Sequence, residues 1–196
     1  KRSPKTISVQ VALVCDANGL LMRRRGEGLL AGMAEVGEKF KNNEVYVPEV
    51  LVAARAMNMG MQILKPLLMA NGVKATGKVC IGTVQGDLHD IGKNIVRSML
   101  EANGFDVLDL GIDCPAEKVV ETAKAEGIQI VALSGVLTLA LDSMKATVDA
   151  IKAAGLDCKV IIGGAPVSAE ACKNIGADEW AHSPQKTVAT CKSWAE

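Results

Sequence analysis

The spacing of hydrophobic residues along the chain changes near Gly72. Before that glycine, apolar residues recur three or four positions apart, which is the spacing of one face of an α-helix. After it, short runs rich in Val and Ile alternate with segments of helical spacing, a pattern typical of strands joined by helices. We therefore predict two domains, a helical domain over residues 1–75 and an α/β domain over residues 76–196.

Two apolar stripes define the helical domain. The first predicts a helix that ends at the polar turn Lys41-Asn42-Asn43, and the second predicts a helix after Pro48, a residue suited to a first helical turn. Pro66 interrupts the second pattern, and residues 71–77 have the composition of a linker. The stripes consist of Leu29, Met33, Val36 and Phe40, and of Val50, Ala54, Met57, Met61, Leu64 and Leu68.

The α/β domain is predicted to hold five strands joined by crossover helices. This arrangement favours a doubly wound parallel sheet of the flavodoxin-like (Rossmann-like) kind. Such sheets bind ligands beyond the carboxyl ends of the strands, where the winding reverses between strands one and three. The loops 84–91 and 135–140 are therefore the candidate site. The predicted strands are 78–83, 106–110, 128–134, 159–162 and, with a weaker pattern, 179–181, and the predicted helices are 92–103, 116–126, 141–154, 168–175 and 185–194.

Composition excludes several classes of function. The chain is 49% hydrophobic and 22% charged, and its 22 basic residues equal its 22 acidic ones, so it has no net field to gather nucleic acid or an anionic membrane. No run approaches the roughly 18 apolar residues that cross a bilayer. The apolar stretch before Cys15 is interrupted by Ser8 and Gln10, and the six cysteines form no Cys-x-x-Cys pair. We therefore expect a cytoplasmic protein with reduced cysteines.

The loop after the first predicted strand contains His89, one of two histidines in the chain, with Asp87 two residues before it. A carboxylate at this spacing can hold one imidazole nitrogen and make the other a better metal ligand. A zinc site lacks a second ligand at the usual spacing, because His182 would have to come from the fifth strand alone.

Other ligand chemistries fit this loop poorly. Neither Gly-x-x-x-x-Gly-Lys-Ser/Thr nor Gly-x-Gly-x-x-Gly follows the first strand, so a phosphate loop is excluded. A phospho-receiver would need an aspartate where Ser134 stands, and Ser134 also lacks the Gly-x-Ser-x-Gly elbow of a hydrolase. A metal carried by its own macrocycle remains, since it needs only one imidazole and a large groove.

Three short motifs follow three of the predicted strands: Asp87-x-His89-x-x-Gly92, Ser134-Gly135-Val136 and Gly163-Gly164. Their order, spacing and placement resemble the signatures of the cobalamin-binding domains of methionine synthase, corrinoid methyl-carrier proteins and carbon-skeleton mutases. The likeness covers nearly the whole second domain. It implies that the cofactor's own benzimidazole leaves the cobalt and a protein histidine replaces it.

The resemblance also implies roles for individual residues. His89 would be the lower cobalt ligand in this base-off cobalamin, and Asp87 its hydrogen-bond partner. Ser134 would hydrogen-bond the buried benzimidazole, and the glycines would leave room for the nucleotide tail. The implied cofactor-binding residues are Asp87, His89, Gly92, Ser134, Val136, Thr138, Gly163 and Gly164, together with Phe40 and Val47 of the helical domain.

The helical domain narrows the choice within the family. Residues 37–50 and 53–57 resemble the four-helix-bundle cap of methionine synthase and of corrinoid carriers, and mutases do not place this cap before the cobalamin domain. In capped proteins, aromatic and aliphatic residues at the positions of Phe40 and Val47 shield the methyl group on cobalt. Phe40 also fits simple packing within the bundle.

The sequence departs from the family pattern at three places. The family's Ser-x-Leu is here Ser134-x-Val136, which we expect to loosen the tail pocket slightly. Ala140 stands where methionine synthase has a serine that extends the ligand and carboxylate pair into a triad. Residues before about Arg25 match the family poorly.

The resemblance implies a corrinoid protein that carries a methyl group between two methyltransferases and is itself not a stand-alone enzyme. Its expected partners are a substrate-specific methyltransferase, an acceptor methyltransferase and a reductive activase. Methylated amines, methanol, betaines and aryl methyl ethers remain open as donors, and tetrahydrofolate or a thiol as acceptor. The alternatives are a mutase subunit, which would lack the cap, and a cobalamin-dependent sensor, which would carry a signalling or DNA-binding segment.

Overall fold

The computed structural model describes residues 28–29, 31–70 and 75–195, and it divides into two compact units, residues 1–74 and 75–196. The four-helix cap expected from the sequence is described only in part, because residues 1–27 lie outside the described residues. The apolar stretch before Cys15 and the segment before Arg25 lie outside them as well. None of the helices in the described part of the chain is long and apolar enough to cross a membrane.

The first unit contains helices α2 (Ala31–Lys41) and α3 (Val47–Ala70). Six of the ten predicted stripe residues are buried, which confirms the stripes at those positions. Leu29, Val36 and Phe40 are half-buried, and the side chain of Leu68 lies outside the described residues. The interruption at Pro66 does not end α3, which continues for four more residues. Pro66 is exposed, so water can satisfy the backbone carbonyl that loses its hydrogen bond at a proline. The buried stripe residues are Met33, Val50, Ala54, Met57, Met61 and Leu64.

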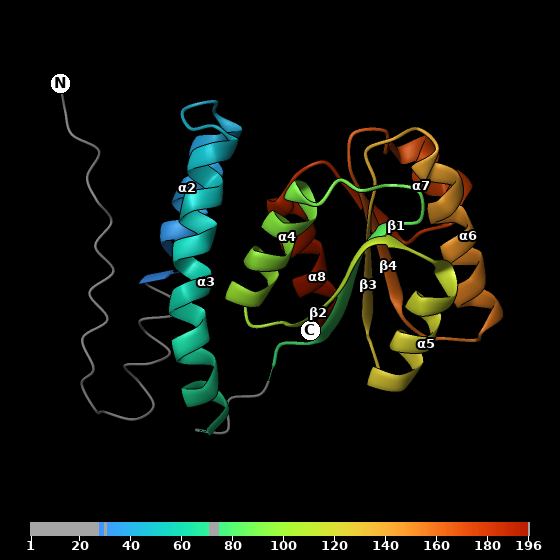
Figure 1. The fold of residues 1–196 in the computed structure, drawn as a ribbon, viewed down its shortest axis with the longest axis horizontal. Helices are drawn as coiled ribbons and strands as arrows, with labels where there is room; N and C mark the ends of the chain where they lie inside the picture. The colour runs from blue at the N-terminus through green and yellow to red at the C-terminus, as the bar shows by residue number, and fades with distance from the viewer. Residues whose placement is uncertain (1–27, 30, 71–74, 196) are drawn as a thin grey trace. The chain divides into compact units, whose positions relative to one another are not determined.

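The second unit is built on a sheet of five parallel strands in the order β2-β1-β3-β4-β5 (Figure 1). This confirms the predicted doubly wound fold and its short fifth strand. Parallel pairing needs crossover helices, and the sequence supplies one between each two consecutive strands. The strands are β1 (Lys78–Val84), β2 (Asp106–Cys114), β3 (Ile130–Ser134), β4 (Lys159–Gly163) and β5 (Glu179–Ala181).

Strand β2 is longer than predicted. Pairing with β1 shifts at Gly82, which lies opposite Gly111, and resumes where Val84 lies opposite Cys114. Gly111 has a φ of 85°, a conformation that glycine adopts without strain. Gly111, which directly follows the predicted strand, therefore allows an irregularity through which β2 continues.

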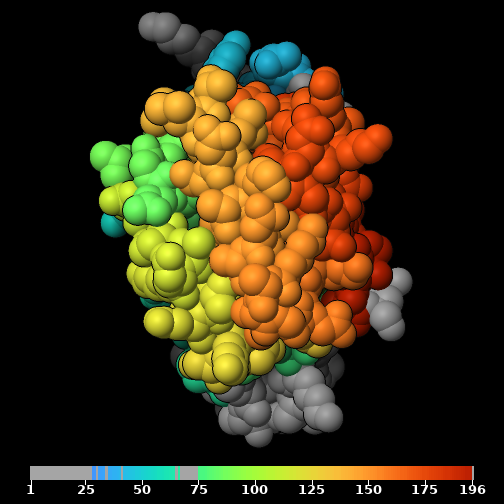
Figure 2. Space-filling view, turned by 90° about the vertical axis from the view of Figure 1, so that its right-hand side faces the viewer, coloured from blue at the N-terminus to red at the C-terminus, as the bar shows by residue number. Residues whose placement is uncertain are grey.

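Two layers of helices cover the sheet (Figure 1). Helices α4 (Ile91–Ala102) and α8 (Pro184–Ala195) pack together on one face. The opposite face carries α5 (Ala116–Glu126), α6 (Ala140–Ala153) and α7 (Ala169–Ile175). Figure 2 shows this second layer from outside, with α6 between α5 and α7.

The two faces of the sheet carry different side chains. Alternate residues of each strand point to opposite faces, and one set, which includes Val131, Leu133 and Ile162, joins a buried apolar core with α5, α6 and α7. The other set faces α4 and α8 and ends in Thr83, Ser134 and other small residues.

Candidate functional site

Three small residues lie side by side where the strands end. Thr83 of β1 is in register with Ser134 of β3, which is in register with Gly163 of β4. Residues in register on neighbouring parallel strands point to the same face, and this is the face covered by α4 and α8. Since the winding reverses between β1 and β3, these residues border the crevice where such folds bind ligands.

His89 lies in the loop after β1, and Asp87 holds it. The imidazole Nδ1 is 2.6 Å from Asp87 Oδ1, and the backbone N–H of His89 donates to the same oxygen at 3.0 Å. A carboxylate only accepts hydrogen bonds, so Nδ1 carries the proton and the lone pair of the neutral ring is on Nε2. The side chain of Asp87 is fully buried while that of His89 is 54% exposed. The structure thus brings together the pair predicted from the sequence, and the lone pair of Nε2 has no hydrogen-bond partner among the described residues.

The second oxygen of Asp87 binds a different loop. Oδ2 accepts the backbone N–H of Val136 at 2.6 Å and that of Leu137 at 3.0 Å. Burial raises the pKa of Asp87, but these N–H groups and those of His89 outweigh it and hold the pKa well below its usual range. The sequence predicted the contact with His89 and missed the contact with the loop after β3.

Two further residues that the sequence analysis missed fix the loop after β1. The hydroxyl of Thr83, which is fully buried, donates to the carbonyl of His89 at 2.9 Å. The backbone N–H of Gly86 donates to Asp113 Oδ1 at 2.8 Å, and the N–H of Asp113 donates to the carbonyl of Asp87 at 3.1 Å. A polar residue within a buried apolar strand was the available signal for Thr83.

The diglycine after β4 has a clear steric reason. Gly164 has a φ of 130°, and a Cβ at this residue would collide with the carbonyl of Gly135. The N–H of Gly135 donates to the carbonyl of Gly163 at 3.1 Å. Glycine at residue 164 therefore lets the loops after β3 and β4 approach each other closely.

The remaining predicted residues of this unit lie around the same edge. Gly92 lies in the first turn of α4, and a Cβ there would meet no atom within 4 Å. Val136 and Thr138 are exposed in the loop after β3. Large apolar side chains that this edge leaves exposed are Leu88, Ile91, Val136, Leu137 and Leu139.

Phe40 and Val47 belong to the first unit. Phe40 is half-buried near the end of α2, and Val47, 38% exposed, is the first residue of α3. Half-burial of Phe40 is consistent with its place on the apolar stripe.

The residues at the carboxyl edge fit a metal that brings most of its own ligands. Within the described ranges, no three side chains of His, Cys, Asp or Glu are grouped so as to hold a metal ion. A corrinoid needs one imidazole, which His89 offers, and apolar surface for a large ring, which the exposed leucines and isoleucine around it provide. Small residues at the strand ends suit a nucleotide tail.

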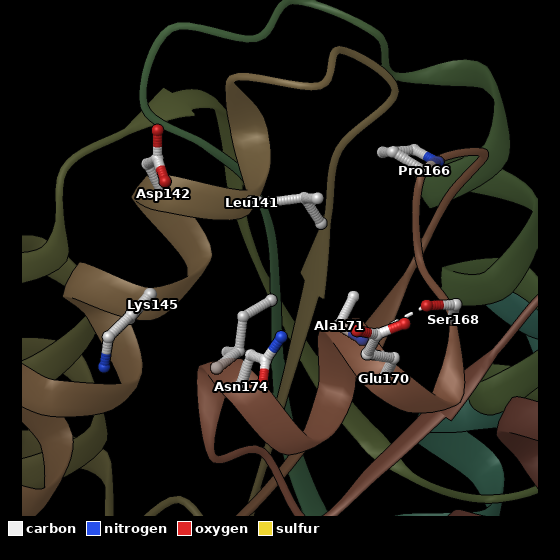
Figure 3. A pocket seen from close by; sticks show the side chains of 9 residues that line it. Leu141, Asp142, Lys145, Pro166, Ser168, Glu170, Ala171 and Asn174 are labelled. Carbon is white, nitrogen blue, oxygen red and sulfur yellow. Dashed lines mark hydrogen bonds between the residues drawn. The ribbon is translucent and has the colours of Figure 1, made fainter.

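A separate cavity of about 360 Å³ lies between α6 and α7 (Figure 3). Leu141 and Ile175 line it together with Asp142 and Glu170. It is on the face of the sheet opposite to Ser134, so it is distinct from the site around His89.

Comparison with known proteins also points to a family that binds B12. A family model described as a B12 binding domain matches residues 77–189, and a second model with the same description matches residues 26–65. The chain is 41% identical to trimethylamine corrinoid protein 1 of Methanosarcina acetivorans over 171 residues, which cover 85% of this chain and 79% of that protein.

Two solved structures share the fold. A cobalamin-binding protein from Desulfitobacterium hafniense DCB-2 is 44% identical with a TM-score of 0.76, covering 89% of this chain and 83% of its own. The methanol:cobalamin methyltransferase complex MtaBC from Methanosarcina barkeri is 26% identical with a TM-score of 0.75, covering 89% of this chain and 67% of the compared chain. The matched models and the relative together show that this chain belongs to the family of B12-binding corrinoid proteins.

Proposed function

We propose that this chain carries a methyl group on a bound cobalamin between two methyltransferases. The observation that supports this most directly is the His89 and Asp87 pair at the reversal of the sheet, with Nδ1 bound and Nε2 free. A bound corrinoid would supply a cobalt that accepts and releases the methyl group.

His89 is the proposed lower ligand of the cobalt, in place of the cofactor's own benzimidazole. Asp87 keeps the proton on Nδ1, so that Nε2 presents its lone pair to the metal. Thr83 supports the same arrangement because it binds the carbonyl of His89. The ligand is thereby held through both its ring and its backbone.

The nucleotide tail is proposed to enter beside the small residues on the α4 and α8 face. The hydroxyl of Ser134 makes no hydrogen bond to any residue that the structure describes, so it is available to the benzimidazole. Gly163 and Gly92 leave room beside the tail, and Gly164 shapes the loop that borders it. Val136 and Thr138 would contact the cofactor from the loop after β3.

The first unit is proposed to shield the upper side of the cobalt through Phe40 and Val47. Aromatic and aliphatic side chains exclude water and confine a methyl group sterically. Replacement of either residue by alanine should leave cobalamin bound and speed photolysis of its methyl form. Equal photolysis rates in variant and parent would assign both residues to packing alone.

The relatives support the donor side of the proposed system. Likeness to a trimethylamine corrinoid protein favours a methylated amine as the methyl donor, ahead of the methanol named for the more distant MtaBC complex. A donor-specific methyltransferase, an acceptor methyltransferase that uses tetrahydrofolate or a thiol, and a reductive activase complete the proposed system.

The two histidines provide a matched test of the ligand assignment. His89→Ala removes the proposed ligand. His182→Ala removes a histidine that directly follows β5 and whose ring contacts Trp180. Both variants should bind hydroxocobalamin and methylcobalamin, since the tail contacts remain. Only His89→Ala should shift the visible band of bound methylcobalamin to shorter wavelength. Identical spectra for both variants would contradict the assignment.

A transfer experiment tests the carrier role. The cobalamin bound to the chain is first reduced to cob(I)alamin by a chemical reductant without oxygen. The chain is then incubated with trimethylamine, with and without a purified trimethylamine methyltransferase, and methylcobalamin is followed by its absorbance. Formation that requires the added enzyme is expected. Formation by the chain alone would contradict a non-catalytic carrier.

A further inference from the structure

One carboxylate, that of Asp87, holds two separate loops. Oδ1 accepts the backbone N–H and the ring Nδ1–H of His89, and Oδ2 accepts the N–H groups of Val136 and Leu137. Two oxygens offer about four lone-pair positions, so these four donors saturate the group. The side chain is fully buried, and water has no access to replace a lost partner.

The loop held by Oδ2, which we call the β3–α6 loop (residues 135–139), carries exposed apolar side chains. Leu137 is 43% and Leu139 76% exposed. Gly135 at its start is fixed against Gly163, and Ala140 at its end is buried as the first residue of α6. Between these points, Asp87 binds the backbone of two consecutive residues, so it sets how the apolar side chains are presented.

Asp87 has this second set of partners although Ala140 offers no hydroxyl. The oxygen of Asp87 that does not bind His89 is occupied by two backbone N–H groups. Backbone donors need no particular side chain, so this feature is invisible in a sequence motif.

We propose that Asp87 is a positioning residue for the β3–α6 loop as well as for His89, and that it sets the orientation of the lower ligand and the shape of this loop together. The part of this proposal that concerns the lower ligand rests on the proposed function, because His89 is a ligand only if a corrinoid binds. The loop contact itself is a property of the chain alone.

Asparagine at residue 87 cannot satisfy both loops. With its amide oxygen toward His89, the NH2 group faces the N–H groups of Val136 and Leu137, and the loop is released. With its oxygen toward the loop, the NH2 group faces His89, and Nδ1 must become an acceptor with the proton on Nε2. Asp87→Asn therefore loses at least one of the two arrangements.

Two measurements on the cofactor-free full chain report separately on the β3–α6 loop and on His89. Amide hydrogen exchange at Val136 and Leu137 reports on the loop, and imidazole ¹⁵N shifts of His89 report on its tautomer. In Asp87→Asn we expect either exchange about ten- to a hundredfold faster at both amides or a tautomer with the proton on Nε2. Unchanged exchange together with an unchanged tautomer would overturn the proposal.

Two control variants separate this role from simpler ones. His89→Ala removes the ring donor and leaves Oδ2 untouched, so exchange at Val136 and Leu137 should stay within about twofold of the parent, well below the effect of losing a bond to a charged group. Asp113→Asn changes a neighbouring carboxylate whose one hydrogen bond within the described part of the chain comes from the N–H of Gly86, and an amide oxygen can accept that bond. An equal effect of either control on the loop would overturn the proposal.

A direct measurement covers the case in which Asp87→Asn does not fold. In the parent protein, through-hydrogen-bond couplings should connect the amide nitrogens of Val136 and Leu137 to the carboxyl carbon of Asp87. Their absence, with the same coupling seen from Gly86 to Asp113, would overturn the proposal. A chain that shows these couplings yet binds no hydroxocobalamin would retain the loop contact and refute the proposed function instead.

Discussion

The two faces of the sheet differ most at its carboxyl edge, although the same strands form both. On the face covered by α5, α6 and α7, Val84, Leu133 and Ile162 are buried in a continuous apolar core. On the face covered by α4 and α8, the adjacent residues Thr83, Ser134 and Gly163 are small. One face is filled by the protein's own side chains, and the strand ends of the other carry the small residues that we propose to border the cofactor. We call the second one the ligand face.

The two layers of helices also differ in the burial of their ion pairs. On the face with α4, Lys93 is buried and lies 2.6 Å from Asp109 of β2, which also binds Arg97 at 2.7 Å. On the opposite layer, the pair of Lys145 and Asp149 is exposed along α6. Helix α4, which begins at the site, is thus held by these polar contacts as well as by buried apolar residues such as Ile95 and Leu100, whereas the exposed pair on α6 adds little to the apolar packing of the opposite layer. Stability and ligand binding should therefore respond differently to changes on each face.

The largest expected effect is on the packed face. Ile162→Ala should lower the free energy of unfolding by about 3 to 5 kcal/mol, because Ile162 is fully buried and a cavity would remain. Both tryptophans, Trp180 and Trp194, lie in the second unit, so urea unfolding followed by tryptophan fluorescence measures this unit.

Ile161, which is 1% exposed and points to the other face, gives the matched variant. Ile161→Ala should cost a similar amount of stability and also change the Kd for hydroxocobalamin. If Ile162→Ala changed that Kd under folded conditions and Ile161→Ala did not, the assignment of the ligand face would be reversed.

The next effect concerns Asp109. Burial raises its pKa, but Lys93, the N–H of Gly111 and Arg97 outweigh burial and hold the pKa below its usual range. Asp109→Asn would leave Lys93 buried without its carboxylate partner and should cost about 3 kcal/mol at neutral pH. The exposed counterpart Asp149→Asn should cost about 0.5 kcal/mol or less.

The pH dependence of Asp109→Asn follows from the direction of the pKa. A carboxylate with a lowered pKa stabilises the fold fully above its unfolded pKa, about 3.9, and this contribution is lost as the pH falls through the lower folded value. The stability difference between parent and variant should be constant from about pH 7 to pH 5 and shrink in more acid solution. A difference that grows on acidification would contradict the role of the ion pair.

The sequence predicts these faces only in part. Each run rich in Val and Ile, such as residues 130–133, is visible in one segment, so the fold could be inferred from the succession of strand and helix patterns. His89 and Asp87 are two residues apart, and their pairing was also predicted. The bonds of Asp87 to Val136 and Leu137 join segments that are 49 and 50 residues apart through backbone groups, and no pattern of side chains encodes them.

The ends of helices and strands were harder to predict than their existence. Pro66 suggested a break in α3 that did not occur, because an exposed proline costs the helix one hydrogen bond and no packing. The predicted strand 106–110 stops before Gly111, but glycine there permits an irregularity and the pairing resumes at Cys114.

A smaller effect is expected at Thr83, on the ligand face. Thr83→Val keeps the shape of this fully buried side chain and removes the hydroxyl that binds the carbonyl of His89. The unfolding free energy should fall by about 1 kcal/mol. The spectrum of bound methylcobalamin should shift toward that of His89→Ala, because the ligand loop is less firmly held. A stability loss with an unaltered spectrum would limit Thr83 to supporting the fold.

The smallest effect on stability is expected at Ser134, next to Thr83 in the register. Its hydroxyl binds no residue in the described part of the chain, so Ser134→Ala should change the unfolding free energy by less than about 0.5 kcal/mol. If the hydroxyl binds the benzimidazole of the tail, the Kd for cobalamin should rise about tenfold, as loss of one buried hydrogen bond implies. Cobinamide, which lacks the benzimidazole, should bind parent and variant equally, because it cannot make this contact. Ser193→Ala, an exposed serine on α8, serves as the control for both ligands. A variant that weakens cobinamide as much as cobalamin would show that Ser134 acts on the site as a whole, and the tail would then need another position on this face.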